Sequence, residues 1–140
     1  MSVELSDDDR ALLGRPLNAI LTVAPAPGRR PAPRPVWFEY RSDGAVEMVT
    51  FADALRVRRI REDPWAAVLV TTPVGETEHW VSLEGPAAVH TDGGGELMNR
   101  LAARYWDLDD PALRAEVDDF VASGPVRIVL TPERSSRYHL

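Results

Sequence analysis

Residues Val49–Pro64 read VTFADALRVRRIREDP, a β-type run followed by a short helical segment at 53–62. We expect the strand to end at Thr50, Asp53 to cap the helix, and Asp63-Pro64 to end it, because a residue before proline avoids helical geometry. Arginines beside the free N–H groups of a strand-to-helix junction favour the binding of a phosphate or carboxylate. The stretch therefore predicts an anion site. Its arginines are Arg56, Arg58, Arg59 and Arg61.

Helical spacing separates these four arginines into two groups. Residues three or four apart share a helix face, which places Arg56 and Arg59 together. We expect Arg56 to bind the anion and Arg59 to support it, whereas Arg58 and Arg61 face solvent. Arg58 can also pair with Glu62 at i+4, and such an exposed pair contributes only about 0.3–0.5 kcal/mol. Stability alone therefore gives little reason for the cluster.

Composition narrows the functions open to these 140 residues, a length that suits one domain, 1–140. The chain has no cysteine, which excludes disulfides, thiolate metal sites and cysteine nucleophiles. Its histidines, His79, His90 and His139, lack the spacing of a zinc motif, so we expect no metal site. We expect His79 and His90 to lie at the surface or at an edge. The formal net charge of -6 argues against a nucleic-acid partner, since nucleic-acid binders usually carry a basic surplus.

The expected location follows from the absence of membrane and export signals. No apolar run approaches the roughly 20 residues that span a bilayer. The start, MSVELSDDDR, is acidic and unlike a signal peptide. We therefore expect a cytoplasmic protein with no membrane partner. The 16 basic residues are all arginine, which, with abundant Ala, Gly, Val and Pro, indicates a GC-rich, actinobacterial-like genome.

Hydrophobic patterning predicts strands that are joined mostly by turns. Asp43-Gly44 marks a hairpin turn, and Gly85-Pro86 marks a bulge or kink inside a strand. Before that kink, His79, Val81 and Leu83 alternate onto one face. The predicted strands are 18–23, 35–40, 45–50, 66–72, 79–90 and 126–131. Six strands joined in this way predict a mainly β fold, an antiparallel β-barrel whose main strands lie in 16–90.

Short helices flank this predicted barrel. Ser6 is placed to cap a helix within 1–15. A helical pair is predicted within 93–123, and Asp110-Pro111 supplies the cap and first position of its second helix. Residues 132–140 follow the last strand, and we expect them to form a frayed polar tail.

The order of these motifs resembles the FMN-binding split β-barrel family, the flavin- and deazaflavin-dependent oxidoreductases related to pyridoxamine 5'-phosphate oxidase. The resemblance extends over about Leu12 to Thr131. It rests on PVWF at 35–38, the strand that ends at Thr50, IREDP at 60–64 and VSLEGPA at 81–87. It implies a six- to seven-stranded antiparallel split β-barrel with short flanking helices.

The resemblance also implies a function. Members are typically homodimers with the cofactor in a groove between subunits, where it exchanges a hydride with a small organic substrate. The implied cofactor is coenzyme F420, whose polyglutamate tail extra arginines can hold, in preference to FMN. No general acid or base stands out in the sequence, which this chemistry permits because the cofactor delivers the hydride. The implied cofactor-binding residues are Arg34, Pro35, Val36, Trp37, Val49, Thr50, Arg56, Arg59 and Trp80.

Two departures leave a second interpretation open. Leu55 stands where the oxidase branch commonly has a basic residue, and Trp80 stands where that branch often has glutamine. The alternative is a non-catalytic flavin-, deazaflavin- or haem-binding split barrel that acts as a carrier or sensor. Trp37 and Phe38 are expected to face opposite sides of one strand, with one in the core and the other free to stack on a ring. Interface packing is the other interpretation of Trp37 and Trp80.

Overall fold

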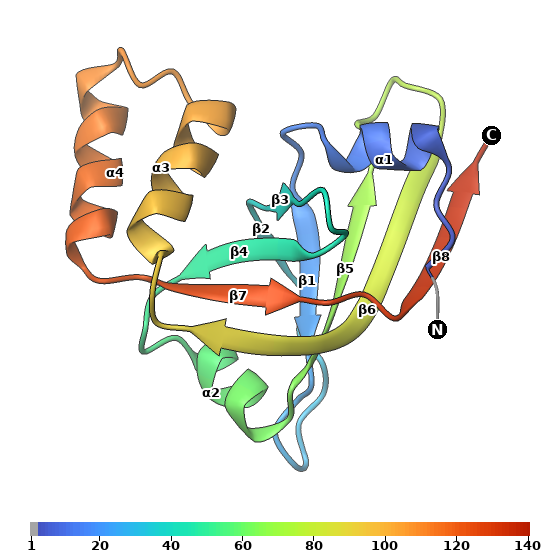
Figure 1. Ribbon diagram of the computed structural model, residues 1–140, viewed down its shortest axis with the longest axis horizontal. Coiled ribbons are helices and arrows are strands. Elements are labelled where there is room, and N and C mark those ends of the chain that lie inside the picture. Colours follow the sequence, from blue (N-terminus) through green and yellow to red (C-terminus); the bar gives the residue numbers. More distant parts are fainter. Residues whose placement is uncertain (1–2) are drawn as a thin grey trace.

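The computed structural model describes residues 3–140, and within them it contains eight strands and four helices (Figure 1). The strands form an antiparallel sheet that curls into a half-open barrel, so the predicted mainly β split barrel with flanking helices is confirmed. The strands are β1 (Ala19–Val23), β2 (Arg34–Val36), β3 (Glu39–Tyr40), β4 (Val46–Thr50), β5 (Trp65–Thr71), β6 (His79–His90), β7 (Val126–Leu130) and β8 (Arg134–His139). The helices are α1 (Asp7–Leu13), α2 (Leu55–Glu62), α3 (Gly94–Tyr105) and α4 (Pro111–Ala122). None of the helices in this described part of the chain is long and apolar enough to cross a membrane.

Strand β6 connects the two halves of the barrel. The order across the sheet is β2-β1-β5-β6-β7-β4-β3, and β8 pairs with β6 off this path. The first part of β6 pairs with β5 and β8, and residues 87–90 pair with β7. The predicted alternation is confirmed, because His79, Val81 and Leu83 are all buried on the barrel side.

Gly85 allows the segment between β7 and β8 to pack closely against β6. Strand β6 runs without interruption through Gly85 and Pro86. A Cβ atom on Gly85 would lie 2.2 Å from the backbone oxygen of Thr131 and 2.9 Å from the backbone nitrogen of Glu133. Glycine is therefore required here by the segment that links β7 to β8, which packs directly on the strand.

The barrel interior and the helical pair form two separate hydrophobic clusters. The first fills the barrel with inward side chains of the strands, and Leu12, Leu13 and Ile60 add the inner faces of α1 and α2. The second lies under α3 and α4 and consists of Met98, Ala102 and Val117 with the partly buried side chains around them. Alternating strand residues and one stripe per helix thus account for both clusters.

The predicted strand 35–40 is wrong as a single element. The chain leaves β2 at Val36 and begins β3 at Glu39, with Trp37 and Phe38 between them. The break has a physical cause: β2 pairs with β1 at one edge of the sheet, whereas β3 pairs with β4 at the other. Phe38 is fully buried in the barrel, and Trp37 lies against the helical pair.

The expected frayed tail is also wrong, because residues 134–139 form β8 along β6. Asp9 of α1 holds this strand through an ion pair with Arg137 and holds β6 through His79, whose Nε2 lies 2.7 Å from Oδ1. His79 is accordingly buried, contrary to the surface position expected for it, and its ring stacks on His139 with centroids 3.9 Å apart. Burial alone would raise the pKa of Asp9, but hydrogen bonds from His79, Ser6 and Arg137 outweigh it and hold the pKa well below its usual range.

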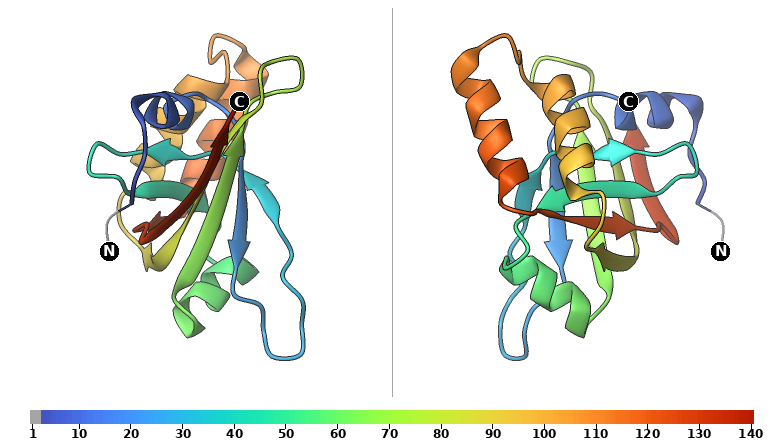
Figure 2. Two further views of the ribbon diagram at one scale, coloured as in Figure 1. Left: turned by 90° about the vertical axis from the view of Figure 1, so that its right-hand side faces the viewer. Right: turned by 60° about the vertical axis from the view of Figure 1, so that its left-hand side comes forward.

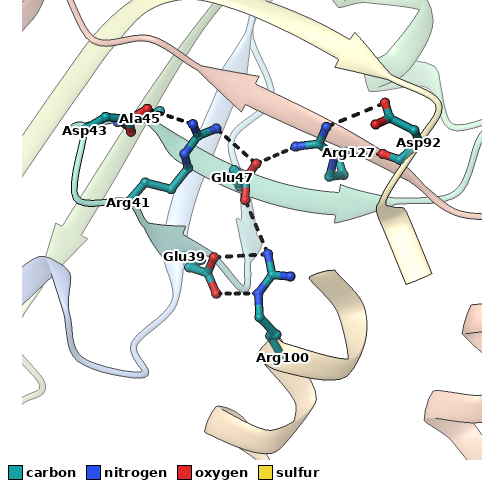
Figure 3. A network of polar contacts seen from close by, with 8 residues as sticks. All are labelled: Glu39, Arg41, Asp43, Ala45, Glu47, Asp92, Arg100 and Arg127. Atoms are coloured by element: carbon teal, nitrogen blue, oxygen red, sulfur yellow. Dashed lines mark hydrogen bonds and ion pairs between the residues drawn. The ribbon is translucent and has the colours of Figure 1, made fainter. Parts of the chain in front are cut away.

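The predicted helical pair is confirmed, with the Asp110 side chain accepting a hydrogen bond from the N–H of Ala112 at the start of α4. A buried carboxylate, that of Glu47, joins β4 to β7 and is also reached from α3 (Figure 3). Glu47 of β4 forms an ion pair with Arg127 of β7 at 2.5 Å, and two more exposed arginines also contact its carboxylate. These are Arg41 at 3.2 Å and Arg100 of α3 at 3.6 Å.

Candidate functional site

The candidate site begins where β4 passes into α2. Thr50, the last residue of β4, is buried opposite Val126 of β7. The N-cap of α2 is Ala54, which makes no side-chain capping bond, so the expectation of Asp53 as cap is wrong. A helix without a side-chain cap presents its first N–H groups to whatever acceptor approaches. The junction therefore offers backbone donors of the kind that bind phosphate oxygens.

Arg56 lies in the first turn of α2 and is partly buried. Burial lowers the pKa of its guanidinium, and the nearby positive charge of Arg34 lowers it further. Within residues 3–140, the guanidinium of Arg56 has no ion pair, and that of Arg34 donates only to the backbone oxygen of Pro33, at 3.0 Å. Two neighbouring cations without a carboxylate between them form a place where an anion is stabilised.

The side chain of Arg59 is occupied by contacts within the protein. This side chain is 11% exposed, its Nε donates to the oxygen of Ala24 at 3.1 Å, and one terminal nitrogen donates to the oxygen of Pro25 at 2.9 Å. Its other terminal nitrogen pairs with Glu62, so the carboxylate that Arg58 was free to pair with is taken by Arg59 instead. Arg59 thus fastens the β1–β2 loop to α2, and both occupy the same end of the molecule (Figure 2).

The segment from Arg34 to Trp37 approaches the junction from β2. Arg34 and Pro35 are exposed, whereas Val36 is buried against β1. The Trp37 ring lies parallel to Tyr105, with centroids 4.8 Å apart and planes at 7°, and meets Trp106 edge-on at 4.9 Å. Arg34, together with Arg56, is therefore available to a ligand, while Trp37 is packed on α3.

The structure brings some of the remaining predicted residues together and separates one. Val49 packs on the same cluster under α3 and α4 as Trp37. Trp80 lies near the start of β6, where it pairs with Thr71 and with Tyr138. Thr50 lies near the far end of β6, because its partner Val126 precedes the residue paired with His90. Within one chain, Trp80 and the junction are therefore at opposite ends of that strand.

Tyr105 lies near the site, although the sequence placed it only within the predicted helical pair at 93–123 and gave it no role in the site. Its hydroxyl donates to the oxygen of Leu17 at 2.6 Å and accepts from the N–H of Phe38 at 3.2 Å. Burial raises the pKa of this hydroxyl, so it stays protonated and can donate. Its partners lie 88 and 67 positions away along the chain, and no local pattern could have indicated them.

Two exposed apolar side chains also border the junction. Phe51 is 52% exposed and packs its ring on Phe120 of α4, and Leu55 is 63% exposed at the first position of α2. Both side chains leave apolar surface open to solvent beside the junction. Among residues 3–140 there is no cluster of three or more His, Cys, Asp or Glu side chains suited to a metal ion.

Comparison with known proteins supports the fold. No family model matches the chain, and no curated protein matches it. Among solved structures, an F420 reductase is 22% identical with a TM-score of 0.75, and the alignment covers 94% of this chain and 98% of that one. A putative pyridoxamine 5'-phosphate oxidase from Listeria innocua is 18% identical with a TM-score of 0.66, covering 96% and 98% of the two chains. The haem storage protein HutZ from Vibrio cholerae is 13% identical with a TM-score of 0.69, covering 97% and 94%.

These likenesses confirm the resemblance predicted from the order of the motifs as one of fold. The protein has the split β-barrel of the pyridoxamine 5'-phosphate oxidase-like proteins. The solved structures that share this barrel include a reductase, a putative oxidase and a storage protein. The choice among such activities must therefore come from the site of this chain.

Proposed function

We propose that this protein binds a flavin-type cofactor and uses it as an oxidoreductase, in hydride transfer to or from a small organic substrate. The observation that carries the proposal is the neighbouring Arg34–Arg56 pair, which has no carboxylate partner among the described residues. A cofactor phosphate at this position would offset the repulsion between the two guanidiniums. It would also accept hydrogen bonds from the uncapped N–H groups at the start of α2. Thr50 adds a hydroxyl at the end of β4.

Each residue of the site has a role in this proposal. Arg56 and Arg34 bind the phosphate, and Arg59 positions α2 by holding the β1–β2 loop. The backbone of Pro35 and Val36 and the side chains of Trp37 and Val49 form the wall for the ring. When bound, the cofactor supplies hydride chemistry, and the protein orients the ring and excludes water.

We propose coenzyme F420 in preference to FMN because of the charge around the phosphate position. The β1–β2 loop carries Arg29 and Arg30, both exposed, and Arg59 fastens this loop next to α2 (Figure 2). Exposed Arg58 and Arg61 project from the same helix. FMN carries no negative groups beyond its phosphate that would use these cations, whereas the polyglutamate tail of F420 would.

We propose that the active form is a homodimer with the cofactor groove at the interface of its subunits. Phe51 and Leu55 supply exposed apolar surface beside the junction, which a second copy would cover. Trp80, remote from the junction within one chain, would reach a cofactor only in the groove of such a dimer. Light scattering of the purified protein tests this, and a monomer at all concentrations would contradict it.

A second candidate is a non-catalytic carrier or sensor that binds flavin, deazaflavin or haem. It is favoured by the lack of a carboxylate or histidine among the residues proposed to line the site and by the haem storage protein that shares the fold. Titration of the purified protein with F420, FMN and haem, followed by absorbance, tests both candidates. Binding with repeated turnover of a quinone, enone or nitroaromatic substrate supports the enzyme, and binding without turnover supports the carrier. No binding at micromolar concentrations would refute both.

A further inference from the structure

Tyr105 joins α3 to two segments that flank the β1–β2 pair. Its hydroxyl donates to the backbone oxygen of Leu17, just before β1, at 2.6 Å. The same hydroxyl accepts from the N–H of Phe38, in the break between β2 and β3, at 3.2 Å. Both backbone groups lie outside the strand ladders, so the tyrosine satisfies polar groups that the sheet leaves open. The hydroxyl thus fastens the break between β2 and β3 to α3 and to the segment before β1.

The ring of the same tyrosine holds the indole of Trp37. Its plane is nearly parallel to that of Trp37, at 7° with centroids 4.8 Å apart, while Trp106 meets the indole edge-on at 88°. A ring that is stacked on one side and contacted edge-on by another has little freedom to rotate. Trp37 is thereby immobilised from α3, although it lies in a two-residue segment without strand pairing.

The same helical pair supports both Trp37 and Val49. Each packs on the cluster of Met98, Ala102 and Val117, and Val49 is followed directly by Thr50 at the end of β4. The helices α3 and α4 lie on the side of the barrel where β4 ends (Figure 1). A change in the position of α3 would therefore move the wall for the ring relative to Arg56.

We propose that Tyr105 is a positioning residue, which acts through Trp37 to fix the wall against which a planar, aromatic cofactor ring is held. This inference rests on the proposed function. It adds to that function a residue that affects binding of the cofactor ring and not binding of the cofactor phosphate. Tyr105 touches neither Arg34 nor Arg56 in any described contact, so its effect is confined to the ring half of the site.

The first test compares FMN binding by the native protein with that of Tyr105→Leu and Tyr105→Phe. Tyr105→Leu removes both the stacking and the hydroxyl, and FMN affinity should fall about tenfold. Tyr105→Phe keeps the ring and should lose about threefold. Tyr40→Phe removes a hydroxyl from a partly buried tyrosine outside the site and is the matched control, with affinity expected to be unchanged. Equal FMN affinity in native protein and Tyr105→Leu would overturn the proposal.

A double-mutant cycle separates positioning from general support of the fold. If Tyr105 acts through Trp37, adding Tyr105→Leu to Trp37→Leu should weaken FMN binding by less than twofold, whereas adding it to Arg56→Ala should again cost about tenfold. A tenfold loss in the Trp37→Leu background would show that the tyrosine acts independently and would overturn the proposal. Inorganic phosphate has no ring. Its inhibition constant, measured by competition with FMN, should therefore be the same in the native protein and in Tyr105→Leu.

Near-ultraviolet circular dichroism monitors the contact between Tyr105 and Trp37 without any cofactor. The near-ultraviolet circular dichroism that disappears in Trp37→Leu defines the signal of the immobilised indole. That signal should also disappear in Tyr105→Leu and persist in Tyr105→Phe, and its persistence in Tyr105→Leu would overturn the proposal even if that variant binds FMN poorly. A native protein that binds neither FMN nor F420 would refute the proposed function, and this inference with it. Native binding with an unaffected Tyr105→Leu refutes this inference alone.

Discussion

Glu47→Gln tests how much one buried carboxylate, which joins β4 to β7, contributes to the stability of the barrel. The side chain of Glu47 is 5% exposed, and its closest partner, Arg127, is 18% exposed and lies at 2.5 Å (Figure 3). A hydrogen bond between charged groups contributes about 1.5–3 kcal/mol, and loss of a partner leaves Arg127 poorly compensated. The two more exposed arginines around Glu47 add less than about 1 kcal/mol each.

The expected loss in the free energy of unfolding is therefore about 2–4 kcal/mol. Urea denaturation followed by far-ultraviolet circular dichroism measures it as a lower midpoint at an unchanged slope. Glu39→Gln is the matched control, because Glu39 is a more exposed carboxylate on the neighbouring strand that pairs with Arg100. Its loss should stay below about 1 kcal/mol.

Two results would refute this reasoning. The first is a loss below about 1 kcal/mol for Glu47→Gln, which would mean that the buried pair is no stronger than a surface pair. The second comes from the double variant Glu47→Gln with Arg127→Met, which removes both charges of the pair. It should be more stable than Glu47→Gln alone, because it leaves no largely buried arginine without its closest carboxylate. A further loss instead would show that Arg127 acts independently of Glu47.

Three further predictions concern the parts that frame the site. Gly85→Ala should lower the free energy of unfolding by about 1–3 kcal/mol, because its Cβ atom would overlap the backbone of the β7–β8 connection. Gly14→Ala, whose Cβ atom would make only ordinary contacts, should be nearly neutral. Urea denaturation compares the two variants, and equal effects would contradict this prediction. Because the pKa of Asp9 is depressed, its contribution is complete above about pH 4 and is lost as the pH falls. Asp9→Asn should therefore lower stability at pH 7 and flatten its decline below about pH 4, and an unchanged acid slope in thermal unfolding would rule this out. Arg59→Met should release the loop at 24–33, seen as faster limited proteolysis there, and native-like cleavage would exclude an anchoring role.

The sequence was informative where structure follows from local pattern. Period-two alternation correctly placed His79, Val81 and Leu83 on one face of their strand, and Asp110-Pro111 opened α4 as predicted. Such signals are local, because a strand or a helix end is determined by residues a few positions apart. The barrel itself followed from the order of these elements and their turns.

Other features depend on contacts that no local pattern records. Strand β8 is polar throughout and lacks hydrophobic alternation, so only its pairing with β6 makes it a strand. His79 is buried because Asp9, 70 positions earlier, accepts its hydrogen bond. Arg59 looked like a second anion ligand from helical spacing alone, yet two backbone oxygens of the β1–β2 loop take its donors. Long-range polar contacts thus account for much of what could not be predicted.

The most direct test of the proposed site is the affinity of the protein for F420 and FMN, measured by fluorescence titration, with and without Arg56→Ala. For FMN, which lacks the polyglutamate tail, Arg58→Ala is the matched control, because Arg58 lies on the same helix and is exposed. The proposal predicts micromolar or tighter binding of a cofactor by the native protein, and FMN affinity that is unchanged in Arg58→Ala. Arg56→Ala should weaken binding by about 1.5–3 kcal/mol, the contribution of a hydrogen bond to a charged group, without a change in unfolding. Equal affinity for the native protein and Arg56→Ala would contradict the placement of the cofactor phosphate at the junction of β4 and α2.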